Sequence, residues 1–161
     1  MLGKKGIAWY GARIMWYDVE SNQYYYYHTN QISENDIEDG KLSTQCLATL
    51  LAHHRASYGS MHDQFILSTD GAGAFAGIDF MARLPYLYQE IGWRIISHYT
   101  GESGGGKGEV DANFALGKKL VRYYVTAQQG ERDIGTVRDL VEVFFYHDDT
   151  IIVLVPSTSI L

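Results

Sequence analysis

The chain has 161 residues, of which 46% are hydrophobic, so its length suits one domain with a single buried core over residues 1–161. Its only cysteine, Cys46, excludes an intramolecular disulfide and a cysteine-rich zinc site. The net charge of −6 excludes a generally basic surface, so any contact with DNA must come from a local basic patch or from segments missing from the chain.

The N-terminal segment Met1–Gly6 is followed by mixed polar and aromatic residues, and not by the apolar run of a signal peptide. No stretch of the sequence approaches the roughly 20 apolar residues that span a bilayer. We therefore expect a soluble protein of the nucleus or cytoplasm that has no membrane partner.

The first part of the chain predicts a β-hairpin followed by a helix. Ile7–Tyr17 is rich in Trp, Tyr and Ile, Asp18–Gln23 supplies turn-forming residues, and Tyr24–His28 is a second aromatic run. After the polar stretch Asn30–Gly40, leucines at helical spacing predict a helix that ends near Gly59.

The middle of the chain predicts a strand, a helix and a second strand. Phe65–Leu67 is typical of a short buried strand, which the small residues of Asp70–Gly73 stop. A helix is expected over about Ala74–Glu90, where Pro85 is tolerated only with a kink or a break. Trp93–Tyr99 predicts the next strand.

The last part begins with the glycine-rich loop Gly101–Gly108, which opens a helix. One face of that helix is expected to pack on the core, because it carries the stripe Val110, Phe114, Gly117, Val121 and Val125. Ile134–Tyr146 predicts a further helix, and Thr150–Val155 is an apolar run of strand length. Alternation of strands and helices indicates an α/β fold with a mixed sheet covered by helices.

Two carboxylates stand at positions where a site could form. Asp70 ends a predicted strand and is followed by small residues that let a metal ion or a phosphate approach closely. Asp111 starts a predicted helix. Each has a simpler alternative, since an Asp can begin a turn or be favoured by the helix dipole. Together, acids from separate elements can converge on two divalent cations.

Lys118 lies seven residues, or two helical turns, beyond Asp111 and shares its helix face. A lysine there could neutralise a DNA phosphate beside the metals, or be an ordinary solvated surface charge.

A family resemblance rests on these residues. Ser68–Phe75 reads STDGAGAF, residues 106–111 read GKGEVD, and residues 3–11 read GKKGIAWYG. In order and type, these segments resemble the ribonuclease-H-like catalytic domain of DDE-type eukaryotic transposases, over nearly the whole chain. The spacing of Asp111 and Lys118 also resembles the integrase pattern, in which a lysine two turns after the last acid meets DNA.

The resemblance implies a ribonuclease-H-like mixed sheet flanked by helices, and metal-dependent cleavage and joining of DNA strands with Mg²⁺ or Mn²⁺. Asp70 and Asp111, 41 positions apart, would be the second and third metal ligands. Relatives carry the first acid on a strand upstream of the Gly-Lys-Lys-Gly segment, and the sequence as given has no such strand. The domain is therefore expected to be N-terminally truncated and incomplete or inactive alone, and whether it is an enzyme stays open.

The same resemblance assigns further residues to the expected site. Glu109 and Asp18 are the candidates to replace the missing metal ligand, although Asp18 is more simply interpreted as a turn residue. The residues expected to bind nucleic acid are Lys107, Lys118 and Lys119. A homo-oligomer or a missing N-terminal segment is a further expected partner.

Two rival functions remain. The less favoured is a P-loop-like nucleotide-binding protein, since Gly101–Lys107 satisfies most of a phosphate-binding P-loop. Gly108 replaces the Ser or Thr that holds Mg²⁺, so a mobile loop closing over DNA is the preferred interpretation. A non-catalytic remnant that acts as a protein or DNA interaction module is the other alternative.

Two further features have a structural and a functional interpretation. Tyr24–Tyr27 could stack bases, but the alternating faces of a half-buried strand explain the run more simply. His53 and His54 are adjacent on a helix and point apart, so they are expected to be packing or surface residues and not a metal pair.

Overall fold

The chain divides into two compact units in a computed structural model that describes residues 6–34, 39–59, 62–71, 73–101, 108–127, 134–145 and 151–154. Unit 1 comprises Met1–Asp36 and Gly108–Leu154, and unit 2 comprises Ile37–Lys107 and Val155–Leu161. Each unit has its own cluster of buried side chains. The single domain expected from the length stays a prediction. Within the described part of the chain, no helix is long and apolar enough to cross a membrane.

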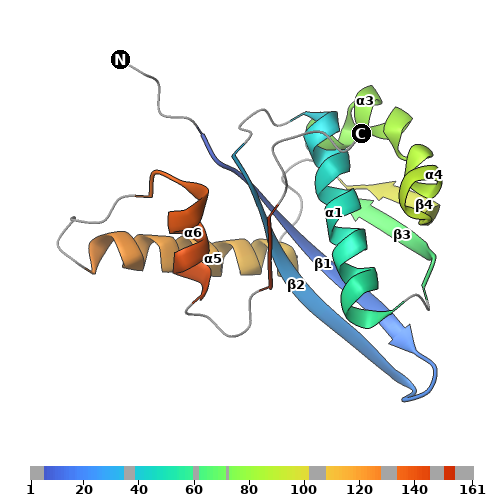
Figure 1. The fold of residues 1–161 in the computed structure, drawn as a ribbon, viewed down its shortest axis with the longest axis horizontal. Coiled ribbons are helices and arrows are strands. Elements are labelled where there is room, and N and C mark those ends of the chain that lie inside the picture. Colours follow the sequence, from blue (N-terminus) through green and yellow to red (C-terminus); the bar gives the residue numbers. More distant parts are fainter. Residues whose placement is uncertain are drawn as a thin grey trace. The chain divides into compact units, whose positions relative to one another are not determined.

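Unit 1 is built on a three-stranded sheet with strand order β1-β2-β5 (Figure 1). Its strands are β1 (Ala8–Asp18), β2 (Gln23–Ser33) and β5 (Ile151–Leu154). β1 and β2 form an antiparallel hairpin, and β5 runs parallel to β2. The hairpin turn includes Asn22 at φ +56°, a left-handed conformation that asparagine adopts more readily than most residues.

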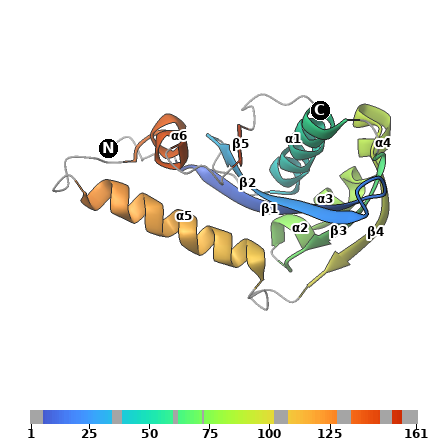
Figure 2. The same ribbon diagram turned by 90° about the horizontal axis from the view of Figure 1, so that it is seen from below.

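Two helices belong to unit 1, α5 (Glu109–Thr126) and α6 (Val137–Phe145). Figure 2 shows α5 along one side of the β1–β2 hairpin. Close approach is possible because glycines stand at the contact: a β-carbon at Gly11 would lie 2.6 Å from Phe114, and one at Gly117 would lie 2.6 Å from Trp9. Ile32, Leu140 and Phe144 form the buried centre of this unit.

The described residues of unit 2 form a two-stranded parallel sheet and four helices. The strands are β3 (Gln64–Thr69) and β4 (Arg94–Thr100), whose register shifts between Phe65 and Ile66. The helices are α1 (Gly40–Tyr58), α2 (Gly73–Ala76), α3 (Ile78–Arg83) and α4 (Tyr86–Ile91). Phe80, Leu84 and Leu87 form its buried centre, and Phe65 and Leu67 from β3 pack against them.

The α/β class, the hairpin, the helix ending before Gly59 and the order of elements are confirmed. The ribonuclease-H-like fold stays a prediction. One mixed sheet was the expectation, whereas the described strands form two sheets. The helix expected over Ala74–Glu90 is three short helices, because Gly77 interrupts it in addition to Pro85.

The strand around Phe65–Leu67 is not buried as predicted. Its residues alternate between half-buried and exposed, and Ile66 is 62% exposed. Helices of unit 2 cover the face that carries Phe65 and Leu67, and the alternation of a strand places Ile66 on the other face.

Candidate functional site

Asp70 directly follows the last residue of β3, at the carboxyl end of the parallel pair, and its side chain is exposed. The first residue of the glycine-rich loop lies beside it in space, since the Gly101 N–H donates to the carbonyl oxygen of Thr69 at 2.9 Å. A β-carbon at Gly101 would lie 3.6 Å from that oxygen. The strand end that carries Asp70 and the start of the glycine-rich loop are therefore neighbours within unit 2.

A histidine that the sequence did not point to lies near the same strand end. The imidazole Nε2 of His98, on β4, is 2.9 Å from the Thr69 hydroxyl, and its Nδ1 is 3.1 Å from the Met81 sulfur. The His98 ring also meets Phe80 edge-on, with ring centres 6.0 Å apart. Simple alternation from Ile95, which packs on the core, would place His98 on the other face of β4. The shift in register sets His98 beside Leu67 and so places it on the core face, and the sequence carries no signal of that shift.

Asp111 stands in the first turn of α5 and is exposed. Its Oδ2 accepts a hydrogen bond from the Gly108 N–H at 3.2 Å, which ties the start of the helix. This is the helix-start role named as the simpler alternative. In addition, the positive end of the helix dipole stabilises a carboxylate at this position.

Glu109, two residues earlier, is engaged with the hairpin. Its Oε2 lies 2.5 Å from Nη1 of Arg13 on β1. The Arg13 guanidinium in turn lies over the ring of Tyr26, 4.5 Å from the ring centre. Burial and the charge of Arg13 lower the pKa of the neighbouring His28, and Glu109 acts in the opposite direction.

Asp18 has the predicted turn role. Its Oδ2 accepts from the Ser21 N–H at 3.2 Å, and its Oδ1 accepts from the Glu20 N–H at 3.3 Å. These bonds close the β1–β2 turn.

Two of the lysines expected to bind nucleic acid, Lys118 and Lys119, belong to α5. Lys118 and Lys119 are exposed, as is Arg122 one turn further on. The predicted core stripe of this helix is half-buried, and it is buried at Gly117. By helical spacing Lys119 lies opposite this stripe, whereas Lys118 lies at its edge, four residues after Phe114. Lys107, the P-loop-like segment and the predicted mobility of the glycine-rich loop concern residues 102–107, which lie outside the described residues.

The structure places the candidate residues in separate units. Asp70 belongs to unit 2, whereas Asp111, Glu109, Asp18 and Lys118 belong to unit 1. Within the described ranges, no group of three or more His, Cys, Asp or Glu residues is arranged to hold a metal ion. A shared two-metal site requires the carboxylates of Asp70 and Asp111 to lie roughly 4–8 Å apart, and this distance stays a prediction.

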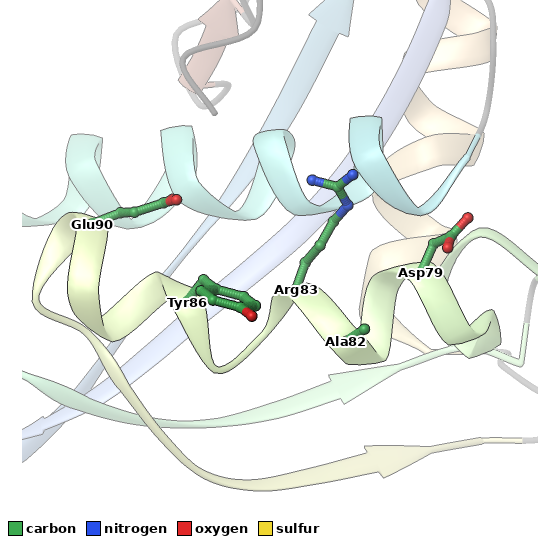
Figure 3. Close-up of a pocket in the computed structure, with 5 residues that line it drawn as sticks. All are labelled: Asp79, Ala82, Arg83, Tyr86 and Glu90. Carbon is green, nitrogen blue, oxygen red and sulfur yellow. The ribbon is translucent and has the colours of Figure 1, made fainter.

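Unit 2 also has a shallow hollow of about 380 Å³ on its helices (Figure 3). Asp79, Ala82 and Arg83 line it from α3, and Tyr86 and Glu90 line it from α4. None of the residues predicted from the sequence to bind metal or DNA lines this hollow.

Of the two histidines of α1, His53 is half-buried and His54 is a packing residue, one of the two roles expected. His54 is buried, and its ring lies 6.0 Å from the ring of Trp93 and 6.2 Å from the ring of His62. Burial, followed by the nearby His62 and His53, lowers the pKa of His54.

Comparison of the chain with protein-family models, with curated proteins and with solved structures found no match.

Proposed function

We propose that this chain is a ribonuclease-H-like domain related to DDE-type transposases, and that it takes part in metal-dependent cleavage and joining of DNA strands. The order and pairing of elements support this. An antiparallel hairpin is followed by a helix, then by two parallel strands with short helices between them, and then by a long helix. The motifs STDGAGAF and GKGEVD span the end of β3 and the start of α5 within that order.

The observation that carries the proposal is the placement of the two acids. Asp70 is exposed at the carboxyl end of a parallel strand, and Asp111 is exposed in the first turn of the helix that follows the next strand. Lys118 stands two turns further along the same face of α5 and is also exposed. A strand-end acid, a helix-start acid and a lysine two turns beyond it match the residue types of a site that binds metal and phosphate.

We propose Mg²⁺ or Mn²⁺ as the cation, because exposed carboxylates are the ligands that hard divalent cations prefer. Such ions, when bound in pairs, polarise the phosphodiester and stabilise the oxygens that attack and leave. The described residues do not contain the three ligands that a firm site needs. Asp18 and Glu109, the candidates to replace the missing metal ligand, are engaged in a turn and in an ion pair. The chain alone should therefore bind a cation weakly and should not cleave DNA appreciably.

The engagement of Asp18 and Glu109 also favours the second candidate function, a non-catalytic module that binds DNA or protein. Exposed Lys118 and Lys119 then supply a local basic patch on α5 in a chain of net charge −6.

Two assays test these proposals on the full chain. Titration calorimetry with Mn²⁺ should detect weak binding that Asp70→Asn abolishes. Asp63→Asn should not affect it, because Asp63 is an exposed acid before the opposite end of β3. Mn²⁺ binding unchanged by Asp70→Asn contradicts the site assignment.

Nicking of supercoiled DNA with Mn²⁺ separates the enzyme from the module. We expect no nicking by the chain alone. Clear nicking that disappears in Asp70→Ala would refute the incomplete site and would assign Asp18 or Glu109 as the replacement for the missing metal ligand.

A further inference from the structure

Unit 2 has a second hollow, of about 340 Å³, which is lined by residues of α3, of α4 and of the start of β4. We refer to it as the Trp93 hollow. Figure 1 shows α4 beside β4. The side chains that line the hollow are of two kinds: Leu84, Trp93 and Ile95 are buried or half-buried, whereas Met81, Tyr88 and Arg94 are exposed. Apolar walls with few polar groups are typical of pockets that bind small molecules.

The core of unit 2 holds the buried part of this lining in place. Leu84 belongs to the buried centre of the unit, and Ile95 packs against that centre. The Trp93 ring meets the Phe65 ring edge-on, with ring centres 6.0 Å apart, and the Arg55 guanidinium lies 5.1 Å from the centre of the Trp93 ring. Arg55 also donates to the two backbone carbonyl oxygens just before Trp93. These side chains would lose their contacts if they moved into the hollow, so the space is preformed.

The exposed part of the lining offers apolar surface that a ligand can cover. Met81 is 45% exposed and Tyr88 is 59% exposed. The Met81 sulfur lies 3.1 Å from Nδ1 of His98 on β4, which holds that side chain beside the strand. A ligand that covers Met81 and Tyr88 and reaches Leu84 and Ile95 removes apolar surface from water, which favours binding.

The charge of the hollow suits an anion. Among the described residues that line it, Arg94 is the only charged one, and its guanidinium has no ion-pair or hydrogen-bond partner in the described part of the chain. The Arg94 N–H donates to the carbonyl oxygen of Asp63 at 2.7 Å, but Asp63 does not line the hollow. In the hollow of Figure 3, by contrast, Asp79 and Glu90 accompany Arg83. A carboxylate matches a guanidinium because it can accept two parallel hydrogen bonds.

We propose that the Trp93 hollow binds a small apolar carboxylic acid in its ionised form. The carboxylate lies on Arg94, and the apolar body of the ligand covers Leu84, Ile95 and Tyr88. A volume at the low end of ligand pockets suits a single aromatic ring or a short acyl chain. None of the residues proposed to bind metal or DNA lines this hollow, so the inference goes beyond the proposed function.

The test titrates the ¹⁵N-labelled full chain in EDTA with hydrocinnamate, in which a short chain joins a phenyl ring to a carboxylate. The amide signals of Met81–Tyr88 and of Trp93–Ile95 should shift, with a Kd in the millimolar range or tighter. The uncharged amide of the same acid is the matched ligand. It should bind about threefold more weakly, because it cannot form an ion pair with Arg94.

Two variants separate the charge from the apolar walls. Arg94→Gln should weaken the binding of hydrocinnamate to the level of its amide and should leave the binding of the amide unchanged, whereas Arg83→Gln should affect neither ligand. Tyr88→Ala should weaken both ligands by the same factor. Tyr86→Ala is the matched control, because Tyr86 is 57% exposed on the same helix and lines the other hollow.

Equal affinity for the acid and the amide, or an unchanged affinity for the acid in Arg94→Gln, would overturn the proposal. Shifts that avoid both Met81–Tyr88 and Trp93–Ile95 would place the ligand elsewhere and would also overturn it. Much tighter binding of an acetylated peptide that ends in phenylalanine would instead assign the hollow to the C-terminus of a partner protein, and a small-molecule ligand would be rejected.

Discussion

The contact between α5 and the hairpin depends on the absence of a side chain at Gly117, and Gly117→Ala tests it. A β-carbon there would lie 2.6 Å from Cζ2 and 2.7 Å from Cη2 of Trp9, and 3.2 Å from Cε1 of Phe144. Trp9 cannot easily move away, because its indole N–H donates to Asn30 Oδ1 at 2.8 Å. Its ring also packs between Phe114 and Phe144, with ring centres 5.1 Å and 5.3 Å away.

The expected magnitude combines two opposing effects. Replacing a mid-helix glycine by alanine favours the helix by about 1 kcal/mol. Overpacking a filled interior costs about 1–3 kcal/mol. We therefore expect Gly117→Ala to reduce the free energy of unfolding of unit 1 by up to about 2 kcal/mol. Ala115→Gly, at an exposed position of the same helix, measures the difference in helix propensity between alanine and glycine alone. It should lower the free energy of unfolding by about 1 kcal/mol.

Removal of the partner ring isolates the contact. Trp9→Leu lacks Cζ2 and Cη2, so Gly117→Ala in that background should approach its favourable propensity value. The double-mutant cycle should give a coupling of about 1–3 kcal/mol. The assay is hydrogen exchange of the β1 and β2 amides in urea, which reads unit 1 by residue. Stabilisation by about 1 kcal/mol in both backgrounds would refute the packing of Gly117 against Trp9.

Three further predictions concern unit 2. Asp39→Ala should reduce the free energy of unfolding by about 1 kcal/mol in urea titrations, because the Asp39 carboxylate caps α1 by accepting from the Leu42 N–H at 2.8 Å. Burial raises the pKa of the Cys46 thiol to about 12, so a thiol reagent at pH 8 should modify the folded chain far more slowly than the urea-unfolded chain, and equal rates would contradict this. The pKa of His54 is lowered in the folded state, so the unfolded state binds the proton more readily and stability should fall as the pH drops through 6.5. His54→Gln should flatten that dependence, and an unchanged slope would show that other groups cause it.

Much of the fold follows from local patterns. The aromatic runs and the turn residues from Asp18 onward predict the hairpin, and leucine spacing predicts α1. Local patterns do not predict features that depend on tertiary packing. Pro85 predicts one helix break, but the second break at Gly77 depends on a close approach in which an added β-carbon would lie 2.8 Å from the Gly73 carbonyl oxygen. The exposure of Ile66 depends on which face of β3 the helices cover.

The candidate site was likewise predictable only in part. The sequence predicts the strand end at Asp70, because small residues follow it, and the helix start at Asp111, because a glycine precedes that helix. It does not predict the ion pair of Glu109 with Arg13, since the two residues are distant in the chain and meet only when α5 packs on β1. The hydrogen bond between His98 and Thr69 likewise requires the register of β3 and β4.

We propose that Asp70 and Asp111 bind the same cation, and paramagnetic broadening by Mn²⁺ tests this proposal most directly. Substoichiometric Mn²⁺ added to the ¹⁵N-labelled chain should broaden the amide signals of Thr69–Gly71 and, in the same titration, those of Glu109–Asp111. Asp70→Asn should abolish the broadening at both places, and Asp63→Asn should abolish neither. Broadening confined to one of the two places, or broadening at Glu109–Asp111 that persists in Asp70→Asn, would contradict a shared metal site.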